Sequence, residues 1–381
     1  MALLPATTRS AEITELDREL AAAVDGAMVV WRGEYVPFPV VPERIAAISG
    51  RGQRDLLYGA YREALEALNP TYRRRLEAWM AAGDPAKAAA ASGPDPRALA
   101  AELERFVLHG ETPYYAALRR YLALLDIEQG DATLADLWHV ARGTAWAHWF
   151  GDREVRRAAL AAGRTVVESA ELGGWRDAEA VLAGPVEADA TPAAKAVRAA
   201  HATLAGSPVW LGEEIGVAAG EIASFADFAA FIRLWRLRHD IAMLQYELRL
   251  FAGPTDPALS RAYYAGILGH MIGVAVPEEA YLADVEGPFA SVRRLEVALL
   301  AAQLVEALET RHGSSWWRDE AARELTVAFG SAASSADALA QLGYDGLDWR
   351  PVLRQIRTRL IGEMSGYGGP NITTRAGTRK V

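Results

Sequence analysis

SFADFAAFIRLWRLRHDIAMLQYELRLF, from Ser224 to Phe251, is the stretch of sequence that decides the fold. Apolar residues recur in it every three or four positions, which is the spacing of one face of an α-helix. The pattern continues for about seven turns at 3.6 residues per turn. We therefore expect one long helix here, buried as a central wall of the protein.

The rest of the chain also predicts helices. Phe289–Thr310 and Trp349–Met364 repeat the apolar spacing. A capping residue followed by proline marks a helix start, because the side-chain oxygen accepts from an orphan backbone N–H and proline has no N–H to satisfy. The five such pairs are Asn69-Pro70, Asp95-Pro96, Thr112-Pro113, Thr191-Pro192 and Asp256-Pro257, and Gly110 is expected to close the helix that starts at Asp95.

Strand signals are few. Val29–Val41 has extended character, but its two prolines argue against a central strand. Loop composition marks Ala81–Pro96 and Leu172–Thr191. We therefore predict an all-α fold with two lobes; the central cleft between them is implied by the family resemblance described below. The expected division is an N-terminal helical lobe in residues 1–171, a boundary loop in 172–191, a C-terminal helical lobe in 192–364 and a flexible tail in 365–381.

Composition limits the function classes. The 381 residues include no cysteine, which excludes disulfides, cysteine-ligated metals and a thiol nucleophile. The net charge of −9 argues against a nucleic-acid partner. No signal peptide or membrane-spanning segment is evident, so a cytoplasmic protein without a membrane partner is expected. Abundant alanine and arginine with little lysine indicate a high-GC bacterial source.

Several helical segments resemble one enzyme family. Gln53–Met80 is similar to the N-terminal helices of zinc oligopeptidases related to oligoendopeptidase F and thimet oligopeptidase. Phe106–Leu125, Pro208–Phe251 and Phe289–Trp317 resemble later parts of the same proteins, in the same order, and so does Ala340–Asp348. The resemblance implies a nearly all-helical fold with a deep channel between two lobes, and hydrolysis of short peptides by one zinc ion.

The family's catalytic motif is missing from this chain. His-Glu-x-x-His places two zinc ligands on one helix face, with the glutamate as general base. None of the seven histidines is followed by glutamate, and none has a histidine four residues later. Val167–Glu171, where the motif would fall, keeps glutamate but no histidine. The chain therefore resembles a truncated, degenerate oligopeptidase, and we expect no bound metal and no cofactor.

Other arrangements of the histidines and aromatic residues carry weaker alternatives. Asp136 with His139 and Glu309 with His312 are acidic-x-x-His pairs, the unit of helical di-metal sites. Pairs of this kind are expected by chance in a chain with so many acidic residues, so solvated or core histidines are the preferred interpretation. The tryptophan-rich segment Trp138–Trp149 is interpreted as core rather than as a ligand cage.

These observations lead to three functional hypotheses. The first is a non-catalytic pseudo-peptidase that binds a peptide, a peptide-like ligand or a protein partner in the cleft between the lobes. The alternatives are a metal-free enzyme of a specialised biosynthetic pathway, with acid–base work at His239, Glu247 or His270, and a metallohydrolase with a cryptic site. The expected ligand-binding residues are His239, Tyr246, Glu247, Tyr263, Tyr264 and His270.

Overall fold

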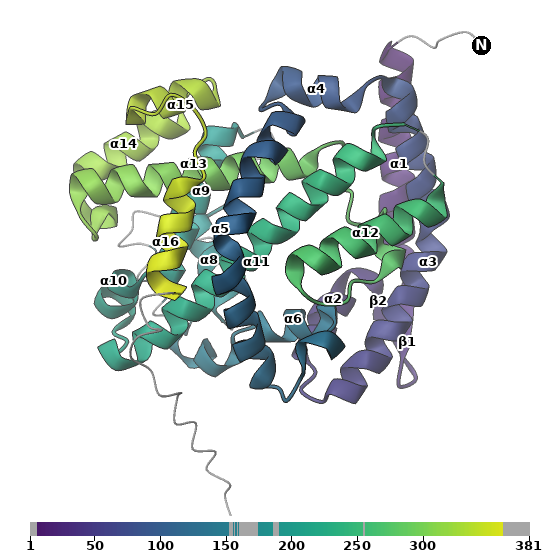
Figure 1. The fold of residues 1–381 in the computed structure, drawn as a ribbon, viewed down its shortest axis with the longest axis horizontal. Coiled ribbons are helices and arrows are strands. Elements are labelled where there is room, and N and C mark those ends of the chain that lie inside the picture. The colour runs from purple at the N-terminus through teal and green to yellow at the C-terminus, as the bar shows by residue number, and fades with distance from the viewer. Residues whose placement is uncertain are drawn as a thin grey trace, which may run out of the picture.

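The fold is all-α, apart from one small hairpin (Figure 1). The structure is a computed structural model, and it describes residues 6–151, 155, 157, 159, 174–185, 190–253 and 256–360. The main helices of the first half are α1 (Ala6–Gly26), α2 (Val41–Ala47), α3 (Arg51–Ala82), α4 (Pro85–Ser92), α5 (Pro96–Ala123), α6 (Leu134–Val140) and α8 (Trp175–Ala183). Those of the second half are α9 (Pro192–Ala202), α10 (Pro208–Trp210), α11 (Ala219–Leu250), α12 (Pro257–Ile272), α13 (Ala290–His312), α14 (Glu320–Gly330), α15 (Ser335–Leu342) and α16 (Arg350–Leu360).

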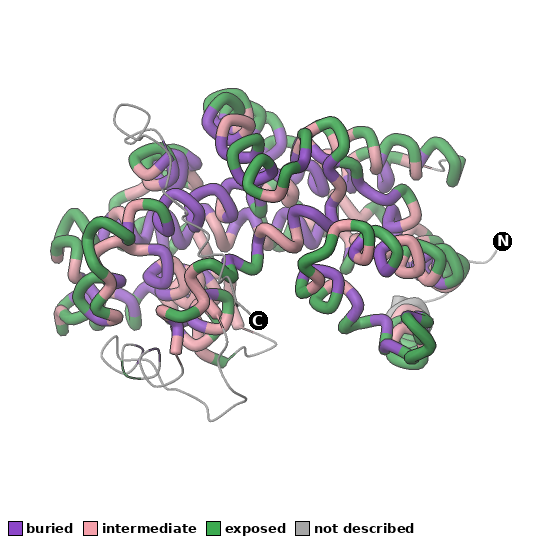
Figure 2. The backbone as a smooth tube through the Cα atoms, turned by 90° about the horizontal axis from the view of Figure 1, so that it is seen from below, coloured by how far each residue is buried: buried purple, intermediate pink, exposed green. Residues whose placement is uncertain are grey.

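Helix α11 is the central element, as the sequence predicts. It begins at Ala219, five residues before the expected start, and ends at Leu250. Figure 1 shows it crossing the middle of the molecule, with α5 and α16 over its first half and α12 beside its second half. Its buried residues lie on every side of the helix, because neighbours pack against it all round. The buried backbone through the middle of Figure 2 reflects this position.

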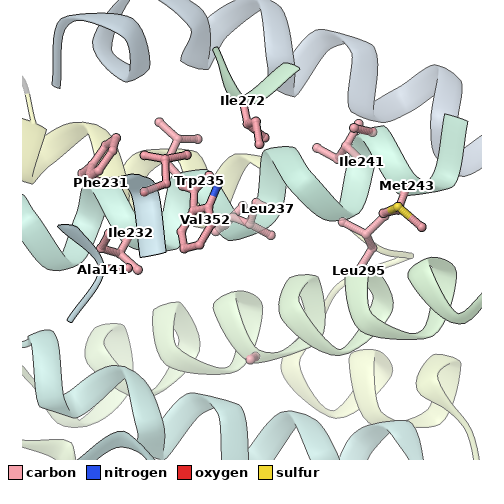
Figure 3. Close-up of a cluster of buried hydrophobic side chains, with 14 of the residues drawn as sticks. Ala141, Phe231, Ile232, Trp235, Leu237, Ile241, Met243, Ile272, Leu295 and Val352 are labelled. Carbon is pink, nitrogen blue, oxygen red and sulfur yellow. The ribbon is translucent and has the colours of Figure 1, made fainter. Parts of the chain in front are cut away.

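The core is one cluster of buried apolar side chains that extends along the chain from Leu20 to Leu360. Figure 3 shows its part along α11, where Met243 faces Leu295 of α13 and Trp235 lies near Val352 of α16. Helices α9 and α13 pack against each other beside it, and α1 packs along α3. The described parts of both expected lobes thus contribute to one core.

Three of the five predicted helix starts are confirmed with the expected hydrogen bonds. The Asp95 side chain accepts from the backbone N–H of Arg97 and Ala98. Thr191 accepts from Ala194 in the same way at the start of α9. Asp256 caps α12 by accepting from the backbone N–H of Ala258, at 2.9 Å.

The other two predicted starts are wrong, because Pro70 and Pro113 lie inside α3 and α5. The end predicted at Gly110 is wrong for the same reason. A proline inside a helix removes one backbone hydrogen bond and costs about 3 kcal/mol. Both helices nevertheless continue, because the turns on either side of the proline bury one continuous apolar stripe. In α3 that stripe includes Leu65 before Pro70 and Trp79 after it.

The two segments expected to be loops each contain a helix. Helix α4 lies within residues 81–96, and its N-terminus is capped by Asp84. Helix α8 lies within residues 172–191 and buries Trp175, whose indole N–H donates to the carbonyl of Ala141. Alanine-rich composition with strong helix propensity explains α4, and burial of one tryptophan face explains α8. The tail in residues 365–381 lies outside the described residues.

The segment with extended character forms a hairpin. Strands β1 (Met28–Trp31) and β2 (Glu34–Pro37) pair antiparallel, with Trp31 opposite Glu34. The two turn residues, Arg32 and Gly33, both have positive φ, as a two-residue hairpin turn requires. The sheet has only these two strands, so neither of them is a central strand. The buried face of the hairpin, with Val29 and Val36, packs against the helices.

Candidate functional site

A row of polar side chains follows one face of the otherwise buried helix α11. Arg233, Arg236, Asp240 and Glu247 are separated by three, four and seven residues, so they lie on one side of the helix. Arg238 is on a different face, where it stacks on Tyr114 and donates to the carbonyl of Met271. Because burial of charge is costly, such a row needs partners or a recess that admits solvent or ligand.

Five tyrosines gather beside the second half of this row, and we call them the tyrosine cluster: Tyr58, Tyr61 and Tyr72 of α3, Tyr246 of α11 and Tyr264 of α12. The rings of Tyr246 and Tyr264 meet edge to face with centroids 5.2 Å apart. The Tyr264 hydroxyl donates to the carboxylate of Asp284. Residues about 200 positions apart in the sequence therefore surround one carboxylate.

Asp284 is the electrostatic centre of the tyrosine cluster. Burial is the main cause of the raised pKa values of all five tyrosines, and the charge of Asp284 adds to the increase in each of them. The pKa of Asp284 is itself raised by burial, and the charge of His239 opposes the increase.

Two hydroxyls in the tyrosine cluster have unused hydrogen-bonding capacity. The side chains of Tyr58 and Tyr246 are buried, with 7% and 0% exposure. Neither hydroxyl finds a hydrogen-bond partner among the described residues. A buried hydroxyl without a partner costs about 1–3 kcal/mol. This cost is recovered if a bound ligand supplies the missing partner.

His239 and Asp240 continue the polar row beside the cluster. The Nδ1 atom of His239 is 3.8 Å from Oδ1 of Asp240, and that oxygen accepts from Nε of Arg294 at 2.7 Å. Burial disfavours protonation of His239, but the carboxylates of Asp240 and Asp284 outweigh it, so the pKa of His239 is raised. His239 keeps 27% of its side chain exposed despite this burial. The combination is typical of a side chain that lines a recess.

Glu247 lies at the end of the row and is fully buried. The hydroxyl of Ser291 on α13 donates to its Oε2 atom, while Oε1 has no partner among the described residues. Burial raises the pKa of Glu247 to about 7, and the Ser291 hydrogen bond and Arg294 oppose this increase. Its carboxyl is therefore about half protonated at neutral pH.

A cavity of about 570 Å³ lies at the middle of the polar row. Trp138 of α6, Glu179 of α8, and Trp235 and Arg236 of α11 are among the residues that line it. Two guanidinium nitrogens of Arg236 lie 3.1 Å from Oε2 of Glu179. The indole N–H of Trp235 has no partner among the described residues.

Trp138 connects this cavity to the tyrosine cluster. Its ring lies edge-on to Tyr58 and Tyr61, at centroid distances of 5.8 and 5.9 Å. We use the name α11 recess for the cavity together with the adjoining tyrosine cluster and Asp284. Aromatic faces, both signs of charge and unpaired polar atoms are all present in the α11 recess.

A second cavity, of about 730 Å³, lies near the first half of the polar row. Its lining includes Glu309 of α13 and Gln355 and Arg359 of α16. The Gln355 side-chain oxygen accepts from Arg233 at 2.9 Å, so the polar row also reaches this cavity.

The sequence-predicted site residues do not all lie together. His239, Tyr246 and Tyr264 are in or beside the tyrosine cluster around Asp284. Tyr263 is on its outer side, 40% exposed, with its ring centroid 6.4 Å from that of Tyr246. Glu247 contacts Ser291 and is not exposed.

His270 lies apart from the other predicted residues. It lines a separate, open cavity of about 640 Å³ with Tyr115 and Gln129. Its backbone carbonyl accepts from the Tyr115 hydroxyl. Tyr263 and His270 are seven residues apart on α12, so they lie on the same side of the helix about two turns apart, whereas Tyr264 lies on another side.

Sequence reasoning missed Asp284, the three tyrosines of α3, and the arginines of the polar row. The spacing of Arg233 and Arg236 with Asp240 and Glu247 was a usable signal, because charged residues rarely recur on a helix that is buried all round. No local signal indicates Asp284, which acquires its role only through the residues packed around it.

The acidic-x-x-His pairs have other partners. Asp136 is buried and accepts from Arg54 at 2.8 Å, while His139 Nδ1 is 2.7 Å from the carbonyl oxygen of Ala46. His312 contacts Asp319 at 3.1 Å. Within the described ranges, no three His, Asp or Glu side chains are arranged to hold a metal ion. Residues 167–171, where the family's zinc motif would fall, lie outside those ranges.

The tryptophan-rich segment is mainly core. Trp146 and Trp149 lie on the short helix η3 (Thr144–Trp149) and contact Phe225 of α11, with ring centroids 5.5 and 5.6 Å from it. Trp138 differs from them, because it also lines the α11 recess.

Comparison with known proteins adds no family assignment. No protein-family model matches the chain, and no curated protein matches it. Among the described residues, no helix has both the length and the apolar character needed to span a bilayer.

Proposed function

We propose that this chain is a non-catalytic binding protein that takes a peptide or peptide-like ligand in the α11 recess. One observation carries the proposal: the Trp235 indole N–H, which has no partner among the described residues, lines a cavity together with aromatic and charged side chains. The Tyr58 hydroxyl also lacks a partner there, and its ring contacts Trp138 of the cavity lining. A peptide offers backbone donors and acceptors at short intervals, together with apolar side chains. It can therefore satisfy the Tyr58 hydroxyl and the Trp235 indole while it packs on the aromatic rings.

The resemblance to zinc oligopeptidases supports the same ligand class. A chain that keeps the helices around a peptide channel but lacks the zinc ligands retains binding without hydrolysis. A metal-free enzyme is the second candidate, because the Glu247 pKa of about 7 suits proton transfer at neutral pH. Glu247 is fully buried, however, and no substrate atom can reach it without a rearrangement. Binding is therefore the preferred function.

The proposal is tested by titrating the purified chain with a library of tetra- to hexapeptides and following tryptophan fluorescence. Trp138 and Trp235 line the cavity, so occupancy should change the emission. Tyr58→Phe removes only a hydroxyl that lacks a protein partner, so it should leave the fold intact. It should weaken the best ligand about five- to tenfold, as the loss of one hydrogen bond of about 1 kcal/mol predicts.

Tyr35→Phe is the matched control, because the same hydroxyl is removed from a side chain that is 75% exposed on the hairpin. Its affinity should equal that of the wild type. Absence of saturable binding by any library member, or equal affinities for the wild type and Tyr58→Phe, would overturn the proposal.

A further inference from the structure

One cavity has an apolar side and a charged side, which come from different helices. It is the cavity of about 730 Å³ near the first half of the polar row, and we call it the α16 cavity. Its charged side consists of side chains from α13 and α16, chiefly Glu309 and Arg359. Its apolar side is one face of α11, because the lining residues there recur at positions i, i+3, i+4 and i+7. They are Ala219, Ile222, Ala223 and Ala226.

Arg359 is a cation of this lining that has no partner. Its guanidinium makes no hydrogen bond and no ion pair with another residue of the described ranges. The side chain is half-buried, and its Nη1 atom lies 3.7 Å from the position that a Cβ atom would take on the buried Gly206. Burial lowers the pKa of Arg359, and the charge of Glu309 opposes this effect. All five N–H donors of the guanidinium therefore remain for a ligand.

A second guanidinium is held beside the same lining by Gln355. Gln355 and Arg359 are four residues apart on α16, so they lie on one side of that helix. The amide nitrogen of Gln355 donates to the carbonyl of Ala302 at 3.0 Å, and its oxygen accepts from Arg233 at 2.9 Å. Both ends of the amide are thus engaged, which fixes Arg233. No described carboxylate lies within salt-bridge distance of Arg233.

The acids of the cavity leave one positive charge in excess. Glu306 is neutralised by Arg354, whose Nη2 atom lies 2.6 and 2.8 Å from its two carboxylate oxygens. The Tyr344 hydroxyl also donates to Glu306, at 2.7 Å. Glu309 makes no ion pair with any described residue. Two guanidinium groups without ionic partners therefore stand against one such carboxylate, and a ligand with a single negative charge balances them.

A carboxylate on an aliphatic body fits both sides of the α16 cavity. A carboxylate matches the planar fork of a guanidinium and accepts two parallel N–H bonds from it. A phosphate monoester carries about 1.5 to 2 negative charges at neutral pH, which exceeds the positive charge available here. Hydrocarbon placed against the α11 face is removed from water, and this favours binding in proportion to the apolar area that is buried.

We infer that the α16 cavity binds an aliphatic monocarboxylate, with its carboxylate at Arg359 and its hydrocarbon part against the apolar face of α11. The α16 cavity shares no lining residue with the cavity of the α11 recess. The inference therefore stands independently of the proposed function and adds a second ligand class.

The test titrates three eight-carbon compounds into the full chain by isothermal calorimetry, at pH 7 and low ionic strength: octanoate, octan-1-ol and octylamine. Octanoate should bind saturably and at least tenfold more tightly than the alcohol or the amine, because only the carboxylate pairs with Arg359. Hexanoate should bind about tenfold more weakly than octanoate, since two fewer methylene groups are buried.

Two substitutions should change the octanoate affinity in opposite directions. Arg359→Gln removes the cation, so it should weaken octanoate at least tenfold while changing the affinity for octan-1-ol less than twofold. Glu309→Gln removes a like charge, so it should strengthen octanoate binding about two- to fivefold. Arg357→Gln is the matched control, because Arg357 is exposed on the same helix and does not line the cavity. Its octanoate affinity should equal that of the wild type.

Circular dichroism checks the fold of each variant. Ala223→Leu replaces Arg359→Gln if the latter does not fold. Ala223 is half-buried on the apolar side of the cavity, so the larger side chain should fill part of the space. It should weaken octanoate at least tenfold without any change of charge.

The C-terminus of a peptide has the same chemistry as a free fatty acid, so N-acetyl-Leu-Leu is titrated beside octanoate. Tighter binding of octanoate identifies a free acid as the ligand, and tighter binding of the dipeptide identifies a peptide C-terminus. Either result supports the inference if Arg359→Gln weakens it.

The contrary outcomes concern the cavity alone. Absence of saturable binding by both carboxylates, or affinities for octanoate and octan-1-ol within twofold of each other, overturns the inference. An octanoate affinity that is unchanged in Arg359→Gln overturns the placement of the carboxylate. Each of these results leaves the proposed function standing, because Tyr58→Phe tests a hydroxyl beside the other cavity.

Discussion

At the scale of single residues, Glu247 shows how burial changes the chemistry of a side chain. The carboxyl has no exposure, one hydrogen bond from Ser291 and one oxygen without a partner. The charged form is therefore poorly solvated, and the pKa rises from the reference value of 4.5 to about 7. A group whose pKa is raised in the folded protein binds more protons in the folded state than in the unfolded state. For Glu247 this difference holds between pH 4.5 and about pH 7.

The sign of the resulting pH dependence follows from this difference in bound protons. The contribution of Glu247 to stability is present below pH 4.5 and is lost as the pH rises to about 7. At 1.36 kcal/mol per pKa unit, the loss amounts to about 3 kcal/mol. Glu247→Gln keeps the shape and removes the titration. The free energy of unfolding of this variant, minus that of the wild type, should increase by up to that amount between pH 4.5 and 7.5.

Urea denaturation at these two pH values measures the difference. Glu104→Gln is the control, because Glu104 on α5 is exposed and its substitution should leave the pH dependence as in the wild type. A constant difference between Glu247→Gln and the wild type across this range would show that Glu247 is charged throughout in the folded protein.

At the scale of secondary-structure elements, the end of α12 depends on one glycine. Gly273 has φ of +75°, and its N–H donates to the carbonyl of Gly269 at 2.8 Å. A Cβ atom at this position would lie 2.6 Å from Tyr115 and 2.7 Å from Leu118 of α5. The left-handed conformation ends the helix, and the missing side chain lets it approach α5.

Gly273→Ala should therefore destabilise the protein by about 2–4 kcal/mol, since left-handed backbone strain and overpacking add together. Gly266→Ala in the middle of the same helix is the control. A Cβ there meets nothing within 4 Å, so alanine should stabilise by up to about 1 kcal/mol through helix propensity. Thermal denaturation of both variants would contradict this account if their midpoints moved in the same direction.

At the scale of the whole molecule, the described core is continuous. One cluster of buried apolar side chains includes Leu20 near the N-terminus, Ile241 on α11 and Leu360 at the end of α16. Helix α11 packs against α5 of the first half of the chain and against α12, α13 and α16 of the second half. Separate unfolding of either half would expose a large part of α11 to water.

We therefore expect a single cooperative unfolding transition for the full chain. Far-ultraviolet circular dichroism reports the helices, and tryptophan fluorescence reports the packing of Trp138, Trp175 and Trp235. Their urea transitions should coincide in midpoint and slope. Two resolved transitions would instead support lobes that fold independently, as the sequence-based division at residues 172–191 implies.

Local sequence patterns determined the all-α character, the buried helix α11 and three helix starts. Periodic apolar residues and capping side chains act within a few positions, so their physical effect is visible in the chain itself. The caps at Asp95, Thr191 and Asp256 are of this kind. His239 and Tyr246 were selected because they lie on the α11 pattern, and Tyr264 because it clusters with Tyr263 and His270 in a glycine-rich helical segment.

Only the tertiary structure decided how helices continue and which polar groups meet. Pro70 stays inside α3 because packing on both sides outweighs one lost hydrogen bond. Asp284 accepts from Tyr264 and adds to the raised pKa values of tyrosines on α3, α11 and α12, because the fold brings these helices together. Desolvation and charge–charge interactions depend on distances in space between residues far apart in sequence. No local pattern carries that information, and so the chemistry of the α11 recess became visible only in the folded chain.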